Sequence, residues 1–374
     1  MVRITPATIE KICTRNGQFY VPERIQTSIG GCLANDNEDL ITEEYHRLMD
    51  KFKEYRLSTR PAQIDYKKDL TLDAYTIYYL SRYMSIPSIA LRDLTIHPFF
   101  QNVPDSFNVL DLGSGTGAVV LGLLSLFDTA PLSRVALNFT AIDCCAEALD
   151  RQKCLIKKAG FNSEQVHHYE EDLCDINSCM KLATKESPYY LIFLANCLTE
   201  LERDVATELV GRLPEILAKN GAIIIAEAQR NYIKELIRTL ATSAEGHGLY
   251  VYYPCPSIGC PPNYGSWCWV WRYHEYDFPP IKVNGQPLQE EPRDELILSW
   301  LILARQNVSI YDTFAKKRSD LLWGPISRVK PHFCACYGDR EMSFERDYDV
   351  SPSYKRGSIV GLSSELEVKE YYEM

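Results

Sequence analysis

A glycine-rich turn is the part of this sequence whose residue types and spacing most clearly suit chemistry. The stretch "NVLDLGSGTGA" starts at Asn108 and is followed by the apolar run "AVVLGLLSLF". Its residues are Asp111 near the end of an expected strand and then Gly113, Ser114, Gly115, Thr116 and Gly117. Glycine has no Cβ, so this backbone can turn tightly and approach a bound molecule, while the next helix offers free amides. The turn predicts a nucleotide-type cofactor site.

Two acidic residues downstream fit the same site. Asp143 closes the apolar run "ALNFTAID", and Asp172 lies in "VHHYEEDLCD" at the expected tip of the next strand. An ionised carboxylate only accepts hydrogen bonds and has room for both hydroxyls of a ribose. Taken alone, Asp143 would more readily be a helix N-cap. Together with Asp111, the glycines and Asp172, it favours cofactor binding.

The order of residues in the turn distinguishes two kinds of nucleotide site. Dinucleotide dehydrogenases normally read G-x-G-x-x-G, whereas here an acid leads the loop. The turn resembles the first motif of class I S-adenosylmethionine-dependent methyltransferases. The resemblance implies that the loop lies under the methionine part of the cofactor, that Asp143 takes the ribose hydroxyls and that Asp172 accepts from the adenine amino group.

Asn196 and Glu227 are the candidates on the side of the methyl acceptor. Both end apolar runs, "LIFLAN" and "GAIIIAE", and ligands of parallel α/β sheets bind at the carboxyl ends of the strands. Asn196 could contact methionine or substrate, or could simply be a turn asparagine. The tetrapeptides typical of amino-group methylases are missing, and no cysteine is placed as a nucleophile, so the catalytic residues stay unknown.

A second motif suits a soft metal. In "YYPCPSIGCPPNYGSWCWVW", Cys255, Cys260 and Cys268 lie among prolines and glycines, and "PHFCACYGD" offers Cys334 or Cys336 as a fourth thiol. Four thiolates can hold either zinc or an iron–sulfur cluster, and the spacing does not choose between them. The alternative is a set of buried or disulfide-bonded cysteines.

The segments that must position these residues alternate between expected strands and helices, as in a parallel α/β fold. Short apolar runs at "NVLDLG", "ALNFTAID", "YYLIFLAN" and "GAIIIAEA" alternate with amphipathic segments at 145–158 and 202–217. Before residue 100 the pattern is helical, with Tyr45, Leu48 and Phe52 on one face and Thr71 as the cap of a helix that ends before Pro87. We expect a helical cap at 1–100, a Rossmann-like doubly wound domain at 101–250 and a cysteine-rich module at 251–374.

Composition bounds the class of protein. The 374 residues are 46% hydrophobic and 24% charged, as in ordinary globular proteins, and no apolar run is long enough for a membrane span. The net charge of −10 opposes non-specific attraction to nucleic acid. The segment around Lys316–Arg318, Arg328 and Lys330 is a candidate for a local basic patch, and the alternative is an ordinary solvated surface. The expected location is the cytoplasm. The start of the chain lacks the apolar core of a signal peptide.

The sequence contains thirteen cysteines, an odd number, and several of them, including Cys144, Cys154 and Cys197, lie in segments expected to be core. This indicates reduced thiols and therefore a cytoplasmic location.

The order of motifs resembles the methyltransferase-like family of small-ribosomal-subunit assembly proteins, known from mitochondria and with prokaryotic relatives. The match runs through "RPAQIDY", "VLDLGSGTGA", "LTELER", "PCPSIGCPPNYGSWCWVWR", "LILSWLILAR", "CACYGD" and "KRGSIVG". This resemblance implies a [4Fe-4S] cluster, earlier thought to be zinc, on Cys255, Cys260, Cys268 and Cys334, with Cys336 as the fallback. It also implies rRNA or the small ribosomal subunit as partner, and the mitochondrial matrix as the location in a eukaryote.

Three functions therefore stay open at this stage. The first is an S-adenosylmethionine-dependent methyltransferase acting on rRNA or a ribosomal component. The second is a non-catalytic assembly factor that binds the cofactor, and the third is a small-molecule methyltransferase with a zinc-stapled lid. We expect a protein that is monomeric when free and does not enter a membrane.

Overall fold

The structure is a computed structural model that describes most of the chain up to residue 253 and parts of it thereafter. The described residues are 1–15, 18–58, 60–61, 63–228, 230–253, 272–277, 282–283, 286–287, 295–310, 321–323, 359–362 and 368–372. None of the helices in these ranges combines the length and the apolar character needed to cross a membrane.

Five parallel strands form the centre of a mixed sheet. They are β5 (Ser106–Leu112), β6 (Ala136–Asp143), β7 (Val166–Glu170), β8 (Tyr189–Ala195) and β9 (Leu217–Ala228), in the spatial order β7-β6-β5-β8-β9. The apolar runs of β5, β8 and β9 are buried over several successive residues, since helices cover both faces of the sheet, whereas β7 is mostly half-buried or exposed. The prediction of a parallel-rich α/β fold is confirmed, as are the four strands that the apolar runs indicated.

The strand order reverses direction between β5 and β8. From β5 the chain moves outward to β6 and β7, and it then returns to place β8 and β9 on the other side of β5. At such a switch point the loops after the two central strands turn away from each other and leave a crevice. The turn that begins at Gly113 and the turn that begins at Asn196 face this crevice.

The sheet continues antiparallel beyond β9. Strand β14 (Glu295–Ala304) pairs with β9, placing Ile302 opposite Ile224 and Trp300 opposite Ala226. Further pairing joins β10 (Tyr250–Tyr253) and β11 (Arg272–Asp277) to β14, β3 (Gln18–Tyr20) to β11, and β2 (Thr14–Arg15) to β3. One sheet thus takes strands from all three segments that the composition distinguishes, whose division into domains stays a prediction.

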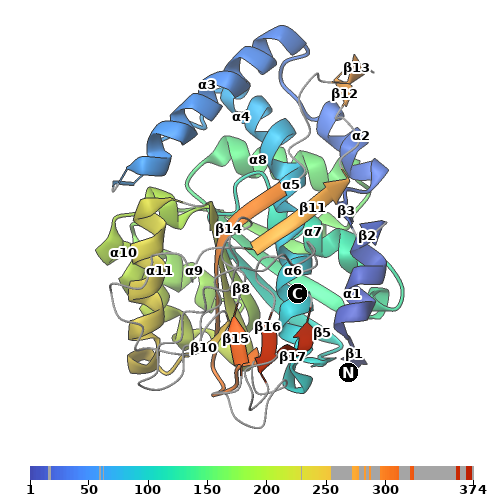
Figure 1. Cartoon of the computed structure of the whole chain (residues 1–374). Helices are drawn as coiled ribbons and strands as arrows, with labels where there is room; N and C mark the ends of the chain where they lie inside the picture. The colour runs from blue at the N-terminus through green and yellow to red at the C-terminus, as the bar shows by residue number, and fades with distance from the viewer. Residues whose placement is uncertain are drawn as a thin grey trace.

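Helices pack on the two faces of the sheet in separate groups (Figure 1). One group contains α1 (Pro6–Cys13), α6 (Ile86–Ile96) and α7 (Ala118–Phe127), with α8 (Ala146–Lys158) on β6 and β7. The other contains α9 (Ile176–Thr184), α10 (Arg203–Arg212) and α11 (Asn231–Ser243). The expected helix at 145–158 is confirmed, and the one expected at 202–217 ends earlier, at Arg212, and gives way to a 3-10 turn before β9.

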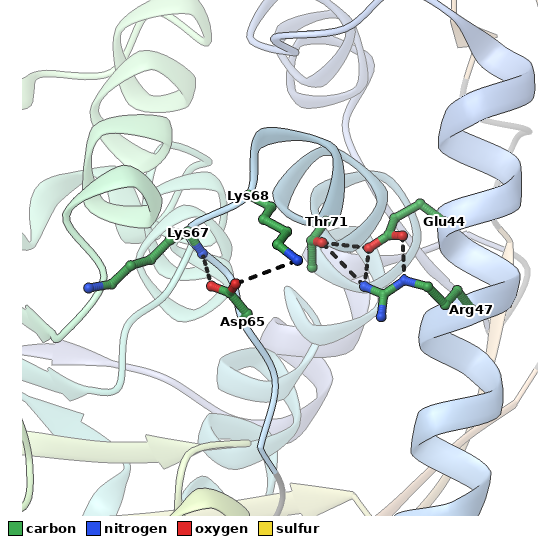
Figure 2. Close-up of polar contacts among 6 residues, drawn as sticks. All are labelled: Glu44, Arg47, Asp65, Lys67, Lys68 and Thr71. Carbon is green, nitrogen blue, oxygen red and sulfur yellow. Dashed lines mark hydrogen bonds and ion pairs between the residues drawn. The ribbon is translucent and has the colours of Figure 1, made fainter.

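The segment before α6 is largely helical and is called the cap below. It contains α2 (Glu23–Gly31), α3 (Glu38–Leu57), α4 (Asp69–Tyr75), a π-helical stretch η1 (Thr76–Leu80) and α5 (Ser81–Tyr83). The apolar face of α3 is confirmed by the burial of Tyr45 and Leu48. The prediction for Thr71 is wrong, because α4 begins at Asp69 and the Thr71 hydroxyl donates to Glu44 of α3 instead (Figure 2). Pro87 lies in the first turn of α6, where its missing N–H costs nothing.

The remaining described elements are short. The strands are β1 (Val2–Arg3), β4 (Asn102–Val103), β12 (Lys282–Val283), β13 (Gln286–Pro287), β15 (Leu321–Trp323), β16 (Ile359–Leu362) and β17 (Val368–Tyr372). The 3-10 helices are η2 (Pro98–Phe100), η3 (Leu132–Arg134), η4 (Ser163–Gln165), η5 (Leu198–Glu200), η6 (Leu213–Glu215) and η7 (Ala244–His247). Of these, η5 matters for the site because it follows β8 at the crevice.

Candidate functional site

Glycine is required at two positions of the turn after β5 for steric reasons. Gly113 and Gly117 have φ angles of 68° and 91°, in the left-handed region that a side chain disfavours. A Cβ on Gly113 would lie 2.3 Å from the Cβ of Cys197, and one on Gly117 would lie 2.5 Å from Cγ of Gln152. Gly115 differs, because a Cβ there would meet nothing within 4 Å. The turn is therefore packed at both ends and open in the middle.

Asp111 anchors the turn from below. Its carboxyl is buried and accepts a hydrogen bond of 2.7 Å from the hydroxyl of Ser114. Burial raises the pKa of Asp111 to about 7, Asp143 raises it further, and the Ser114 hydrogen bond works in the opposite direction. Thr116 is also buried. The side chains of the turn thus point into the protein, and its backbone is left to face the crevice.

Asp143 holds the turn from the neighbouring strand. It ends β6, and its Oδ2 accepts from the amide of Gly115 at 2.7 Å while its Oδ1 accepts from the amide of Cys145 at 2.8 Å. The N-cap position of α8 belongs to Cys145, so Asp143 does not cap the helix. Burial raises the pKa of Asp143, and these two amides oppose the rise.

Asp172 and Asn196 reach the crevice from β7 and β8. Asp172 lies two residues beyond β7, is exposed and accepts from the amide of Cys174 at 2.8 Å. Asn196 has a positive φ of 59°, as a turn asparagine does, and its Oδ1 accepts from the amide of Ala228 at 3.0 Å. Both predicted residues line the crevice, and Asn196 also joins the ends of β8 and β9.

Glu227 lies behind the crevice. The side chain is fully buried, and its Oε1 accepts from the amides of Cys197 and Leu198 at 3.0 and 2.8 Å. Its Oε2 has no hydrogen-bond partner among the described residues. Burial raises the pKa of Glu227 to about 8. Glu227 therefore positions the backbone after Asn196. The sequence predicted that it would contact the methyl acceptor, but Glu227 does not line the cavity.

The crevice contains a cavity of about 280 Å³. Its floor is formed by the glycine turn and the ends of β6 and β8, and its lining residues outside the turn include Tyr66, Leu72, Tyr75, Tyr83, Asp143, Cys144, Cys145, Ala148, Asp172, Leu173, Cys174, Asn196, Cys197, Glu200 and Leu201. Four acidic residues are among the lining, Asp111, Asp143, Asp172 and Glu200, and no lysine, arginine or histidine of the described part of the chain is. The cavity is close to the lower end of the size range of small-molecule sites, roughly 300–1,000 Å³.

Glu200 and three tyrosines were missed by the sequence analysis. Glu200 ends η5, and its Oε1 accepts a hydrogen bond of 3.3 Å from the hydroxyl of Tyr66 in the cap. Glu200 is an exposed residue that lines the cavity, and desolvation of its carboxyl by the neighbouring protein raises its pKa to about 7, with Asp143 adding to the rise. Tyr75 and Tyr83 lie beside it, so the cap provides an aromatic roof, defined here as Tyr66, Leu72, Tyr75 and Tyr83.

The roof is fastened to α8 by a buried ion pair. Arg151 of α8 donates to Asp73 of α4 at 2.6 Å, and both side chains are buried. Asp73 also accepts from the amides of Ala34 and Asn35 and from Asn35 Nδ2. Because Leu72 and Tyr75 flank Asp73, this ion pair sets the position of the roof over the floor.

Two further links hold the cap. A disulfide joins Cys32, after α2, to Cys154 of α8, so the expectation that Cys154 is a reduced core thiol is wrong. Glu44 and Arg47 of α3 form an ion pair beside Thr71 of α4, which ties the two helices together (Figure 2). The floor and roof of the cavity therefore belong to one packed unit.

The free cysteines at the cavity differ in exposure: Cys145 and Cys197 are buried, whereas Cys144 and Cys174 are exposed, so the expectation that Cys144 is a core thiol is wrong. Burial raises the pKa of Cys144 and Cys145 to about 11 and that of Cys197 well above its usual value. A thiol in such surroundings is a poor nucleophile, because the thiolate is the reactive form. This agrees with the sequence analysis, which assigned no cysteine a nucleophilic role.

The predicted metal ligands Cys255, Cys260, Cys268 and Cys334, and the alternative Cys336, lie outside the described residues. Within the described ranges, no group of three or more histidine, cysteine, aspartate or glutamate side chains could hold a metal ion. The basic patch of residues 316–318, 328 and 330 is likewise outside them.

Comparison with known proteins gave matches among solved structures only. No family model and no curated protein sequence matches the chain. An O-methyltransferase family protein from Burkholderia thailandensis is 14% identical over 73% of this chain and 72% of its own, with a TM-score of 0.43. A ribosomal protein L11 methylase from Lactobacillus delbrueckii subsp. bulgaricus is 10% identical over 61% of this chain and 80% of its own, with a TM-score of 0.34. A putative S-adenosylmethionine-dependent methyltransferase from Streptococcus mutans is 12% identical over 59% of this chain and 48% of its own, with a TM-score of 0.35.

Proposed function

We propose that the cavity binds S-adenosylmethionine and that the protein is a methyltransferase or a methyltransferase-like protein. The main support for this proposal is that the open glycine turn is hydrogen-bonded to Asp143 at the switch point of the sheet. Gly115 faces the cavity with no atom within 4 Å of its missing side chain, and Asp143 holds that glycine's amide. A ligand can therefore lie directly against the backbone of the turn.

The residues present fit the parts of this cofactor. Each oxygen of Asp143 accepts one amide, and a carboxylate oxygen has a second lone pair free for a ribose hydroxyl. The amides at the start of α7 suit the methionine carboxylate, since the N-terminus of a helix favours an anion. Asp172, exposed at the far end of the cavity lining, is proposed to accept from the adenine amino group.

S-adenosylmethionine supplies, when bound, a methyl group that is already activated by its positive sulfur. The protein then has mainly to align an acceptor with that methyl group, which is a contribution of position and orientation. Asn196 and Glu227 serve this alignment by fixing the backbone between Asn196 and Leu198, which forms one edge of the cavity.

Binding can be tested by equilibrium dialysis with radiolabelled S-adenosylmethionine. Asp143→Ala should abolish binding, because it removes both the hydroxyl acceptor and the partner of the Gly115 amide. Asp150→Ala is the matched control, since Asp150 is an exposed residue of α8 that forms an ion pair with Lys153 and does not line the cavity. If Asp143→Ala bound the cofactor as the wild type does, the assignment of the site would be wrong.

As methyl acceptor or partner we propose rRNA or a component of the small ribosomal subunit. The support is the resemblance of the motifs to ribosome assembly proteins. Cosedimentation with isolated small subunits at low and high salt tests it, because phosphate contacts weaken steeply with salt. Salt-resistant binding without methyl transfer would indicate the non-catalytic assembly factor, and no binding would favour the small-molecule enzyme.

The thiolate cluster or zinc site proposed for Cys255, Cys260, Cys268 and Cys334 is a prediction from the sequence alone. Anaerobic purification followed by iron, sulfide and zinc analysis tests it directly. About four irons per chain with a broad visible absorption band support the cluster. One zinc and no colour favour a zinc-stapled methyltransferase.

A further inference from the structure

The lining of the cavity is unbalanced in charge. Among the described residues, the lining includes four acidic residues and no lysine, arginine or histidine. Arg230 does not line the cavity, although its charge opposes the rise in the pKa of Glu200, and its guanidinium lies 5.3 Å from the ring centre of Phe52 and 5.6 Å from that of Tyr55. A ligand that carries positive charge would therefore meet carboxyl groups that no cationic side chain of this lining neutralises.

Aromatic rings stand on the same side of the cavity as Glu200. Tyr66 donates to the Glu200 carboxyl at 3.3 Å, and the rings of Tyr66 and Tyr75 meet edge to face with their centres 5.1 Å apart. Tyr83 continues this wall through Tyr79, whose ring stacks on both Tyr75 and Tyr83. The negative face of an aromatic ring attracts a cation, and the attraction is larger where water is partly excluded.

We propose that Glu200, with Tyr66, Tyr75 and Tyr83, makes the site selective for a cationic sulfur centre over a neutral one. The site would then distinguish S-adenosylmethionine from S-adenosylhomocysteine, the product of methyl transfer. This inference rests on the proposed function. Glu200 follows Asn196 by four residues after β8 and lines the same cavity as Asp143, whose charge adds to the rise in its pKa. In the proposed binding mode Glu200 would lie near the sulfur, which joins the ribose to the methionine part.

The charge changes in the transfer itself. The bond between sulfur and the methyl carbon breaks with its electron pair staying on sulfur, and a lone pair of the acceptor forms the new bond to carbon. The acceptor then loses its proton to water. Sulfur becomes neutral, so the attraction of Glu200 and the rings for it is lost and the product is released more easily. Selectivity for charge thus opposes product inhibition.

Titration calorimetry at pH 8 with three commercially available ligands tests the inference. They are S-adenosylmethionine, S-adenosylhomocysteine and an analogue in which an amine-bearing carbon replaces the sulfonium. We expect the wild type to bind both cations at least about tenfold more tightly than the neutral thioether, which corresponds to about 1.4 kcal/mol. Glu200→Gln keeps the shape of the side chain and should bring the three affinities to within about threefold, mainly by weakening the cations.

Glu202→Gln is the matched control, because Glu202 is exposed, lies two residues away and does not line the cavity. Tyr75→Leu is a second variant, which removes an aromatic face without changing the charge and should weaken the cations only. Thermal unfolding of each variant shows whether it folds. If the wild type binds the three ligands equally, or if Glu200→Gln keeps the preference, the inference fails while the proposed function stands. If the wild type binds none of them, both fail.

Discussion

Gly113 and Cys197 lie back to back across the switch point between β5 and β8, so closely that a Cβ on the glycine would be 2.3 Å from the Cβ of the cysteine. Gly113 also has a φ of 68°. Gly113→Ala must therefore displace the turn, and we expect it to lose cofactor binding and to lower the free energy of unfolding by about 1–3 kcal/mol. Urea denaturation and dialysis with S-adenosylmethionine measure the two effects.

Gly160→Ala is the control for this prediction. Gly160 has a similar φ of 76° but nothing within 4 Å of an added Cβ, and it lies outside the cavity. Gly160→Ala should lower the free energy of unfolding only by the strain of a left-handed backbone, and it should leave cofactor binding unchanged. Equal loss of binding in both variants would show that contact with Cys197 is not what requires a glycine at position 113.

The ion pair between Asp73 and Arg151 should contribute strongly to folding. Asp73→Ala leaves a buried guanidinium unpaired and two backbone amides without their acceptor. We expect a loss of about 3–5 kcal/mol in the free energy of unfolding. Lys153→Ala, which breaks an exposed pair on the same helix, should cost less than about 1 kcal/mol. Similar losses in the two variants would contradict the importance of burial here.

The bond between Cys32 and Cys154 closes a separation of 122 residues. Reduction of the wild type, or Cys32→Ser, should lower the free energy of unfolding by about 2–4 kcal/mol, because the cross-link restricts the unfolded chain. Non-reducing peptide mapping by mass spectrometry identifies the bonded pair. In the Cys32→Ser variant, a reductant should have no further effect, and a second loss there would mean that another disulfide is involved.

Glu227 should make stability fall as the pH rises. Its pKa is about 8 in the folded protein against 4.5 for an ordinary glutamate, so the folded state holds the proton more firmly. The resulting stabilisation is complete below about pH 4.5 and is lost as the pH rises through about 8. Glu227→Gln should remove this part of the pH dependence, on the order of 1–3 kcal/mol between pH 5 and 8.5. Urea denaturation at several pH values checks the slope, and an unchanged slope in the variant would contradict the assignment.

Binding of S-adenosylmethionine should strengthen between pH 6 and 8, because the pKa of Glu200 is about 7 and only its ionised form attracts a cation. We expect a gain of up to about tenfold, with S-adenosylhomocysteine binding much less affected. The charged or titratable groups around Glu200 are Tyr66, Tyr75, Asp143, Cys144, Cys197, Glu227 and Arg230. Asp111, which also lines the cavity, has a pKa of about 7 as well. Calorimetry on Glu200→Gln separates the contribution of Glu200 from those of the other groups, since the part of the pH dependence that Glu200 causes should disappear in that variant.

The parallel half of the sheet could be predicted because its strands are local apolar runs that end in polar or glycine-rich turns. The same locality explains why Asp111, Asp143, Asp172 and Asn196 could be placed on one edge of the sheet. The position of β14 beside β9 could not be predicted, because it depends on pairing between residues some 75 apart in sequence, such as Ile224 and Ile302.

The roof of the cavity was missed for a related reason. Tyr75, Tyr79 and Tyr83 recur at four-residue spacing, which indicates a helix face but not what the face covers. Tyr75 and Tyr83 line the same cavity as Glu200, and the ion pair between Asp73 and Arg151, which are 78 residues apart in sequence, helps to hold them there. Glu200 itself had a local signal, four residues after Asn196 in "NCLTEL", which could have identified it as part of the same turn.

The place of β14 has a consequence for synthesis on the ribosome. Residues 223–226 of β9 are fully buried between β8 and β14, and β14 begins only at Glu295. A nascent chain that has emerged as far as β9 therefore presents an apolar strand with an unpaired edge until some seventy more residues have followed. Such an edge is a template for pairing with other chains. Release of the chain before β14 should give an aggregating product, and a chaperone that shields strand edges would be needed while these residues are being added.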